Sequence, residues 1–237
     1  NLSNLKKYKL IINCENDNYF SKKFFARSLK KKYDSLAYTT ILKHKKIIKN
    51  DVASQIFTNK GPIAFLPISN SQTSIVYSLK TELYNNDNDI KNLIYKFNTK
   101  YEITKIGTIS KFGLSSSNLR NYYKSNILAF GDLLHKVHPL AGQGFNMSLR
   151  DIICFSKLID KRLDLGLTID SSVCYDFEKE IKDKNLIFST GIDLIYEFFN
   201  FESKTNTALM SKSVQLLGKN KSINRFLTKM ADTGFVI

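Results

Sequence analysis

The stretch Asn126–Asp151, which reads NILAFGDLLHKVHPLAGQGFNMSLRD, decides the fold of this chain. It opens with the apolar run Ile127–Phe130, which has the length of a buried strand. A turn at Gly131-Asp132 ends this run, and the proline and glycines that follow exclude regular structure. Apolar residues return at helical spacing over residues 147–158. The sequence therefore predicts a strand, an acidic turn, a glycine-rich loop and a helix.

The start of this predicted helix is a place where negative charge is stabilised. The first N–H groups of a helix have no partner within it, and the helix dipole is positive at this end. From the residues alone, Asp132 is either a turn or capping residue or a ligand-binding carboxylate. Gly142 and Gly144 serve either a plain loop or one that a ligand approaches closely.

The same stretch resembles the second flavin-binding motif of the FAD-dependent aromatic hydroxylases. The resemblance is carried by Gly131-Asp132, His135, the run His138-Pro139-x-x-Gly142-Gln143-Gly144-x-Asn146, and Asp151. Among these enzymes, which share the fold of p-hydroxybenzoate hydroxylase, it is most similar to the ubiquinone-biosynthesis hydroxylases.

The resemblance implies that FAD is bound by one set of residues: Gly131, Asp132, Pro139, Gly142, Gln143, Gly144, Phe145 and Asn146. Asp132 would accept a hydrogen bond from the ribityl chain, and Pro139 would lie against the flavin edge. The backbone of residues 142–146 would approach the isoalloxazine, and the helix start would stabilise negative charge on reduced flavin. Leu133-Leu134 stands where the family usually has two small residues. No side chain is assigned as a catalytic acid or base.

A metal site is the alternative interpretation of Asp132, His135 and His138, which recur at intervals of three residues. Metal sites need three or four ligands of suitable geometry. The chain has only one other histidine, His44, and no paired-cysteine motif. We therefore expect no metal.

The composition indicates a folded globular protein of one or two domains. The net charge of +15 invites a nucleic-acid interpretation, but the lysines are spread along the chain and no nucleic-acid motif is present, so we expect no nucleic acid. The three cysteines are widely spaced and predict no disulfide framework, which indicates a reducing, cytoplasmic location.

Upstream of the central stretch, residues 9–13 predict a short strand followed by Asp17-Asn18-x-x-Ser21. This resembles the family's strand and Asp-Gly-x-x-Ser, with Asn18 in place of glycine because asparagine tolerates the left-handed conformation. An Asx turn explains the segment equally well. The family normally has an arginine where this chain has Phe24.

Four further strands and one helix are predicted between these two motifs, with a fifth strand after the helix. The strands cover residues 35–44, 54–57, 63–68, 73–79 and 103–114, and the helix covers residues 87–101. The strands resemble the sheet that covers the aromatic ring in the family, although a core sheet without a ligand is the alternative. Beyond Asp151 the chain is predicted to be helical.

The predicted fold class is α/β of a mixed kind, in which part of a Rossmann-like FAD-binding domain is interleaved with an antiparallel substrate domain and followed by C-terminal helices. Residues 1–34 and 115–165 are assigned to the FAD-binding domain, residues 35–114 to the substrate-binding sheet, and residues 166–237 to the C-terminal helical region. No Gly-x-Gly-x-x-Gly fingerprint is present. We therefore expect these residues to be the C-terminal portion of the family's chain, either a fragment or a split subunit.

The resemblance implies a flavin-dependent monooxygenase that uses NAD(P)H and O2 to hydroxylate a polyprenylated phenol in ubiquinone biosynthesis. The implied partners are this phenol and other ubiquinone-synthesis proteins. The basic, apolar C-terminal end has two uses, packing within the protein and peripheral contact with the inner face of a membrane. The alternative function is a non-catalytic relative that acts as an assembly or lipid-binding subunit.

Overall fold

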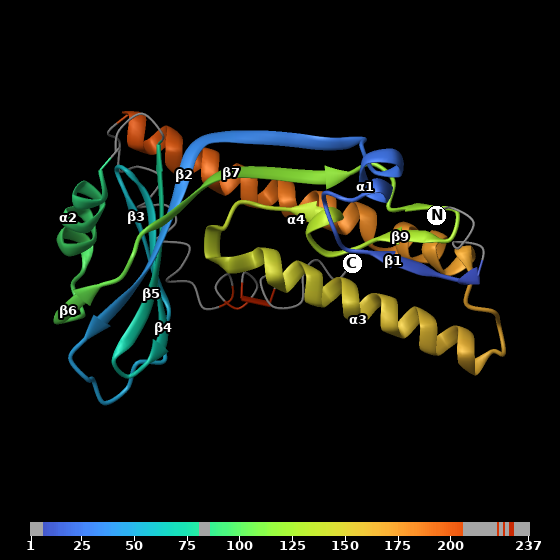
Figure 1. Cartoon of the computed structure of the whole chain (residues 1–237), viewed down its shortest axis with the longest axis horizontal. Helices are drawn as coiled ribbons and strands as arrows, with labels where there is room; N and C mark the ends of the chain where they lie inside the picture. Colours follow the sequence, from blue (N-terminus) through green and yellow to red (C-terminus); the bar gives the residue numbers. More distant parts are fainter. Residues whose placement is uncertain (1–6, 81–85, 206–221, 223–224, 226–227, 230–237) are drawn as a thin grey trace. The chain divides into compact units, whose positions relative to one another are not determined.

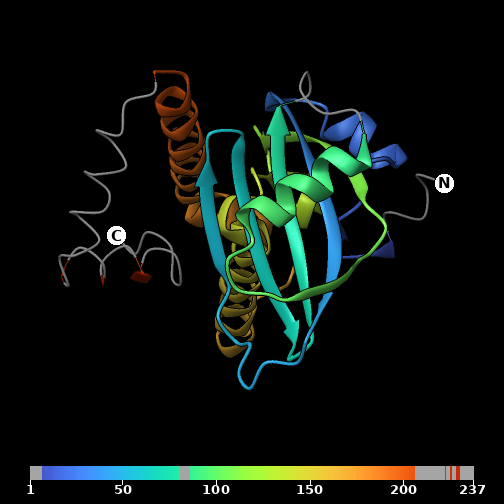
Figure 2. The same ribbon diagram turned by 90° about the vertical axis from the view of Figure 1, so that its left-hand side faces the viewer.

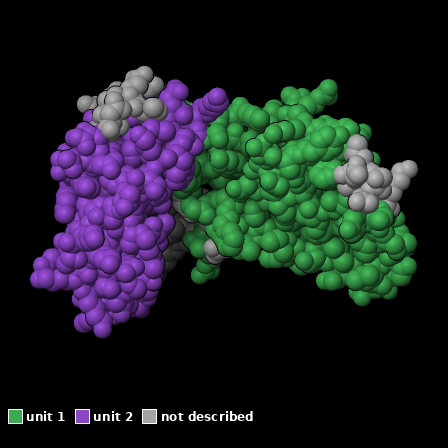
Figure 3. Space-filling view, in the orientation of Figure 1, with its two compact units in different colours: residues 1–31, 115–197, 208–237 green, residues 32–114, 198–207 purple. Residues whose placement is uncertain are grey.

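The computed structural model describes residues 7–80 and 86–205, together with residues 222, 225, 228 and 229. Its helices and strands confirm the predicted mixed α/β class (Figure 1). The chain forms two compact units, which Figure 3 distinguishes by colour. Unit 1 comprises residues 1–31, 115–197 and 208–237, and unit 2 comprises residues 32–114 and 198–207. The long strands β2 (Ser28–His44) and β7 (Ser110–Leu119) each contribute residues to both units.

A three-stranded sheet in unit 1 joins segments that are far apart in the sequence. Strand β1 (Ile11–Asn13) pairs in parallel with β9 (Ile127–Ala129), which pairs antiparallel with β8 (Tyr123–Lys124). All three residues of β9 are buried, as the apolar run at this position predicts. Because β1 and β9 flank unit 2 in the sequence, the fold is interleaved.

The helices of unit 1 pack against this sheet and form an apolar core with it. They are α1 (Tyr19–Phe24), α3 (Gln143–Asp164) and the part of α4 (Ser171–Thr205) that lies within the unit. Within the core, the ring of Phe177 stacks on Phe130 with centroids 5.5 Å apart and meets Phe155 edge-on at 5.3 Å. Such aromatic pairs stabilise a core beyond the apolar area that they bury.

The strands of unit 2 belong to a second, larger sheet. Besides β2 and β7 this sheet contains β3 (Ser54–Thr58), β4 (Gly61–Ser69), β5 (Gln72–Lys80), β6 (Ile103–Ile106) and β10 (His135–Lys136). The order is β10-β7-β2-β5-β4-β3, with β6 paired to β2. The pairings whose register is described are antiparallel, as the short turns between β3, β4 and β5 require.

Three predicted boundaries in this region are wrong for local reasons. Strand β2 begins at Ser28, well before residue 35, although its first residues are largely polar. The strand predicted over residues 103–114 is divided into β6 and β7, and the Gly107 N–H directly after β6 still donates to the Ile41 carbonyl of β2 (2.9 Å). The predicted helix ends at Phe97, because the Asn98 side chain binds both the N–H and the carbonyl of Tyr101.

Helix α2 (Asp87–Phe97) covers one face of the strands of unit 2 (Figure 2). Ile90 and Ile94 on this helix are 1% exposed and belong to the same core as the strand residues. The strand residues of this core that are buried are Tyr38, Leu42, Ile63, Phe65, Ile75, Tyr77 and Leu79. Alternate residues of the same strands point to the opposite face, as the two-residue period of a strand requires.

That opposite face, which we call the open face, is apolar and partly exposed. Its central residues are half-buried, and Ala64, Val76 and Thr39 lie side by side there in the register of β4, β5 and β2. Around them, Ile41, Phe57 and Leu66 are between 39% and 46% exposed. Unit 2 therefore presents an apolar sheet surface within the described residues.

Three further observations concern the cysteines, the described helices and the C-terminal end. All three cysteines are free, which agrees with the absence of a predicted disulfide framework. Among the described helices, none combines the length and the apolar character that crossing a bilayer requires. The basic C-terminal end, to which a membrane contact was assigned, lies almost entirely outside the described residues.

Candidate cofactor site

The residues that the sequence assigns to FAD lie in the segment from the end of β9 to the first turn of α3. After β9, Phe130 donates its N–H to the Asn13 carbonyl (2.9 Å), so the loop begins from a strand fixed to β1. A 3₁₀ turn, η2 (Gly131–Leu133), and the short strand β10 follow. A second 3₁₀ turn, η3 (Leu140–Gly142), leads directly into α3. Prediction and structure agree on strand, turn, loop and helix.

Two glycines in this loop need their freedom of backbone conformation. Gly131 has φ = 61° and Gly142 has φ = 64°, values that other residues rarely adopt. A Cβ atom at either position would find no heavy atom within 4 Å. The space next to both glycines is therefore open to a ligand. At Gly144 a Cβ atom would only touch Val137 Cγ2, at 3.7 Å.

The N-terminus of α3 is uncapped by side chains. Gly142 is the N-cap residue, and among the described residues no side-chain hydrogen bond caps the helix start. The side-chain oxygen of Gln143 is buried, and no hydrogen-bond partner for it is found among the described residues. Unpaired N–H groups and an open glycine fit an electron-rich ring edge. FAD offers such an edge, so these residues fit the cofactor.

The other predicted cofactor residues differ in their exposure. Asp132 is exposed, and Pro139 and Asn146 are partly buried. The Phe145 side chain is 71% exposed. The Leu133-Leu134 pair, which departs from the family's small residues, points instead into the apolar core of unit 1. The core accommodates these two side chains, so they do not fill the loop.

The three residues of the alternative metal site point to different partners. His135 Nε2 lies 2.5 Å from Asp151 Oδ2, and both side chains are buried. The ring of His138 packs against Tyr196, with centroids 4.3 Å apart. In the part of the chain that the structure describes, no group of three potential ligands is positioned to hold a metal. The expectation of no metal remains a prediction.

The environment of His138 opposes its protonation. The residue is 0% exposed. Burial, and then the positive charge of Lys31, lower the pKa of His138 to about 4. A buried imidazole that loses water around its charged form titrates at lower pH. His138 is therefore neutral at pH 7.

The segment after β1 is organised by the side chain of Asn18. Asn18 has φ = −108°, so it is extended and not left-handed. It is the N-cap of α1, and its side-chain oxygen accepts from the Ser21 N–H (2.9 Å). Asn13 joins this cluster, because its side chain donates to Ser21 Oγ (2.9 Å). Phe24 packs against the core of unit 1. Its apolar ring cannot form the polar contacts of the arginine that the family normally has at this position.

Sequence reasoning missed the buried polar residues behind the loop. Asn185 on α4 donates to Asp151 Oδ1 (3.1 Å). Tyr122 is 1% exposed, and its pKa is raised by burial and by the negative charge of Asp151. The signal that could have identified Asn185 is a polar residue at a buried position on a helix. Its partner could not be identified in this way, because it is distant in the sequence.

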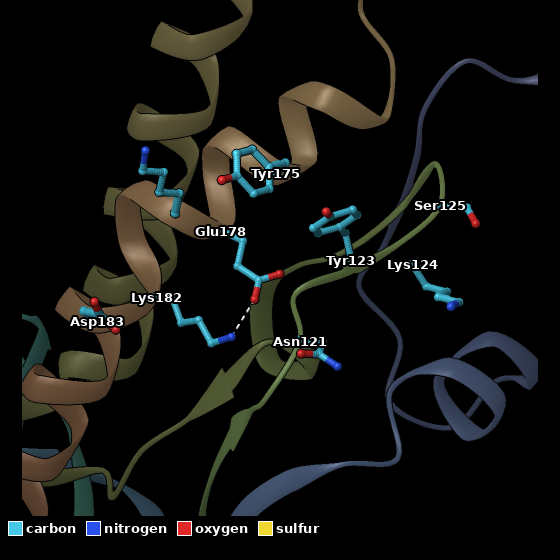
Figure 4. Close-up of a pocket in the computed structure, with 9 residues that line it drawn as sticks. Asn121, Tyr123, Lys124, Ser125, Tyr175, Glu178, Lys182 and Asp183 are labelled. Atoms are coloured by element: carbon cyan, nitrogen blue, oxygen red, sulfur yellow. Dashed lines mark hydrogen bonds and ion pairs between the residues drawn. The ribbon is translucent and has the colours of Figure 1, made fainter.

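A separate surface pocket lies between residues 121–125 and the first half of α4, both in unit 1 (Figure 4). Its volume is about 630 Å³. The lining residues are Asn121, Tyr123, Lys124, Ser125, Tyr175, Glu178, Lys179, Lys182 and Asp183. Glu178 is paired with Lys182 at 2.5 Å. None of the predicted cofactor residues lines this pocket.

Comparison with known proteins gives consistent results. Residues 29–162 match the family described as FAD binding domain. The ubiquinone biosynthesis monooxygenase COQ6 of Xenopus tropicalis is 25% identical over 230 residues, which cover 80% of this chain and 50% of that protein. The 3-demethoxyubiquinol 3-hydroxylase of Escherichia coli is 28% identical over 160 residues, covering 63% and 40%. The chain thus spans about half the length of the curated relatives it matches.

Solved structures show the same fold. The p-nitrophenol 4-monooxygenase PnpA of Pseudomonas putida superposes with a TM-score of 0.70 at 10% identity, covering 97% of this chain and 60% of that one. HpxO of Klebsiella pneumoniae, solved with FAD and uric acid, gives a TM-score of 0.68 at 12% identity, covering 94% and 59%. The family match includes the whole loop between β9 and α3. The chain belongs to the FAD-binding domain family.

Proposed function

We propose that the whole protein is an FAD-dependent monooxygenase that hydroxylates a polyprenylated phenol in ubiquinone biosynthesis. The observation that carries this proposal is the uncapped start of α3 beside the open Gly142, within a chain of the FAD-binding domain family. Its similarity to COQ6 and to 3-demethoxyubiquinol 3-hydroxylase supports the choice of reaction.

The residues of the loop hold FAD in this proposal. Asp132, which is exposed at the turn after β9, accepts a hydrogen bond from the ribityl chain. Pro139 would lie against the flavin edge, and the backbone of residues 142–146 would contact the isoalloxazine. The N–H groups at the start of α3 stabilise negative charge on the ring. FAD supplies the redox chemistry, taking electrons from NAD(P)H and activating O2.

The open face of unit 2 is the surface that we assign to the aromatic substrate. Its apolar, half-buried centre suits a phenol with a hydrocarbon tail, and it excludes water from the ring. In this assignment residues 35–114 bind the substrate, and residues 1–34 and 115–165 bind FAD. Residues 166–237 are assigned to the C-terminal helical region, and its described helix α4 contributes Val173, Phe177 and Ile181 to the apolar core of the cofactor part.

The location and partners follow from the same proposal. The protein is cytoplasmic, and it contacts the inner face of the membrane peripherally to reach a polyprenylated substrate. Other ubiquinone-synthesis proteins are its partners, because they supply its substrate and consume its product. Nucleic acid is not a partner.

A pair of glycine substitutions tests the cofactor site. Gly142 and Gly166 flank α3, both with φ near 65° and both with open space at the Cβ position. Valine at either position therefore costs the same backbone strain. We expect Gly142→Val to weaken FAD binding by the full-length protein about a hundredfold, or about 3 kcal/mol, while Gly166→Val leaves it unchanged. FAD titration followed by visible absorbance measures both.

The result also separates the proposed enzyme from the alternative, a non-catalytic relative. Phe24, which packs in the core where the family has an arginine, favours the alternative. Wild-type protein that is colourless and takes up no added FAD would support the non-catalytic relative. Equal loss of affinity in the two valine variants would show that backbone strain, and not ligand contact, is responsible.

A substitution on the open face tests the substrate assignment. Val76 lies at the centre of this face, between Ala64 on β4 and Thr39 on β2. We expect Val76→Trp to raise KM for the phenol at least tenfold, because an indole fills the space for the ring, without changing FAD affinity. Ile48→Trp is the matched control, since Ile48 is 98% exposed in the same unit. Unchanged steady-state kinetics in Val76→Trp would refute the assignment.

A further inference from the structure

A buried contact between His135 and Asp151 joins the two segments on either side of residues 139–146. His135 stands on β10 before the loop, and Asp151 stands on α3 after it. The two side chains are each 1% exposed, with 2.5 Å between Nε2 and Oδ2. All residues from Pro139 to Asn146 lie between them in the sequence.

Helix α4 holds both partners of this pair in place. Asn185 donates to the second carboxylate oxygen of Asp151 (3.1 Å). Four residues later, Ser189 accepts from the side chain of Asn118 (2.8 Å), and the backbone of Asn118 is paired with His135 in the sheet. Residues four apart share one face of a helix. One face of α4 thus anchors both ends of the loop.

Stability alone does not explain this arrangement. Removing two polar groups from water is costly, and apolar residues of similar volume often serve a core equally well. The pair does give the loop a defined geometry, because a 2.5 Å contact fixes where β10 ends relative to α3. Gly142 and Gly144 within this segment place little restraint on its backbone themselves.

We propose that His135 and Asp151 are positioning residues, a latch that fixes the glycine loop in the geometry that binds FAD. The part of this proposal that concerns FAD rests on the proposed function. Neither side chain needs to touch the cofactor, since the latch acts through the backbone of residues 139–146.

Two substitutions of His135 distinguish its hydrogen bond with Asp151 from the space that its side chain fills. In His135→Gln the side-chain nitrogen reaches the position of Nε2 and donates to Asp151, whereas in His135→Asn it is too short. Asp151→Asn is a third variant that leaves no buried charge, in case His135→Asn does not fold. Its amide places an N–H donor where one carboxylate oxygen accepted, so this donor faces the donor of either His135 or Asn185 as they stand in the wild type.

Hydrogen exchange tests the latch without any cofactor. In the full-length protein we expect His135→Asn and Asp151→Asn to exchange the amides of residues 140–146 at least tenfold faster than wild type. His135→Gln should keep wild-type exchange, and the amides of β4 and β5 in unit 2 are the internal control. Unchanged exchange in both disrupting variants, or His135→Gln behaving like His135→Asn, would overturn the proposal.

FAD binding is the second readout. FAD should bind at least tenfold more weakly to the two disrupting variants, and the visible absorption of bound flavin should shift, with both properties restored in His135→Gln. Faster loop exchange in the variants, combined with no FAD uptake by wild type, would support the latch and overturn the proposed function. FAD uptake by wild type with the same affinity in every variant would overturn the positioning role.

Discussion

Replacing Gly61 with alanine is expected to prevent the sheet of unit 2 from forming in its native register. Gly61 begins β4 with φ = 139°, a conformation that residues with side chains rarely adopt. A Cβ atom there would lie 2.0 Å from the backbone oxygen of Ser78 on β5. Because backbone cannot rotate away as a side chain does, β4 and β5 must separate. The expected loss is several kcal/mol, at least the ~1–3 kcal/mol of a strained backbone site plus the lost pairing.

Gly113→Ala is the matched control for this prediction. Gly113 is an exposed strand glycine of the same unit, and a Cβ atom there meets nothing within 4 Å. Alanine at this position is expected to leave stability unchanged or raise it by a few tenths of a kcal/mol. Thermal and urea unfolding followed by circular dichroism measure both variants. Equal midpoints for Gly61→Ala and wild type would show that β4 and β5 tolerate the added atom.

Acidification is expected to destabilise the protein through His138. In the folded state its pKa is about 4, below the ordinary value of 6.5, because the ring is buried near Lys31. The unfolded chain therefore binds a proton first as the pH falls, so stability is lost between about pH 6.5 and pH 4. One pKa unit corresponds to about 1.36 kcal/mol. The expected loss is about 3 kcal/mol.

The variant His138→Phe isolates this contribution. Phenylalanine keeps a ring against Tyr196 but has no proton to bind. The other titrating groups are shared by both proteins, so the difference between their unfolding free energies reports on His138 alone. We expect this difference to move by about 3 kcal/mol in favour of the variant between pH 7.5 and pH 4. A difference that is constant over this range would show that His138 has the same pKa in the folded and unfolded states.

The parts of the site that were predicted correctly are those encoded by neighbouring residues. The run Ile127–Phe130 is apolar because β9 is buried, and Gly131 and Gly142 occupy left-handed positions. A single stretch of sequence contains all this information. The likeness to a known motif added the cofactor, which no local pattern specifies.

Contacts between distant residues were not predictable in the same way. Nothing in the sequence around Asp151 indicates that it meets His135 and Asn185. At Asn18 the left-handed conformation that asparagine tolerates is not adopted, because a helix begins after this residue and its side chain caps that helix. In β2, pairing in the sheet extends the strand over polar residues that show no strand pattern.

The interleaved sheet sets the order in which this chain folds during synthesis. Ile11 on β1 pairs with Ile127 on β9. At about 5–20 residues per second on the ribosome, the first strand waits on the order of ten seconds for its partner. The hairpins of β3, β4 and β5 join neighbours in sequence and form during this delay. Each nascent chain therefore forms the pairing of β1 with β9 only after the second half of these residues has been translated.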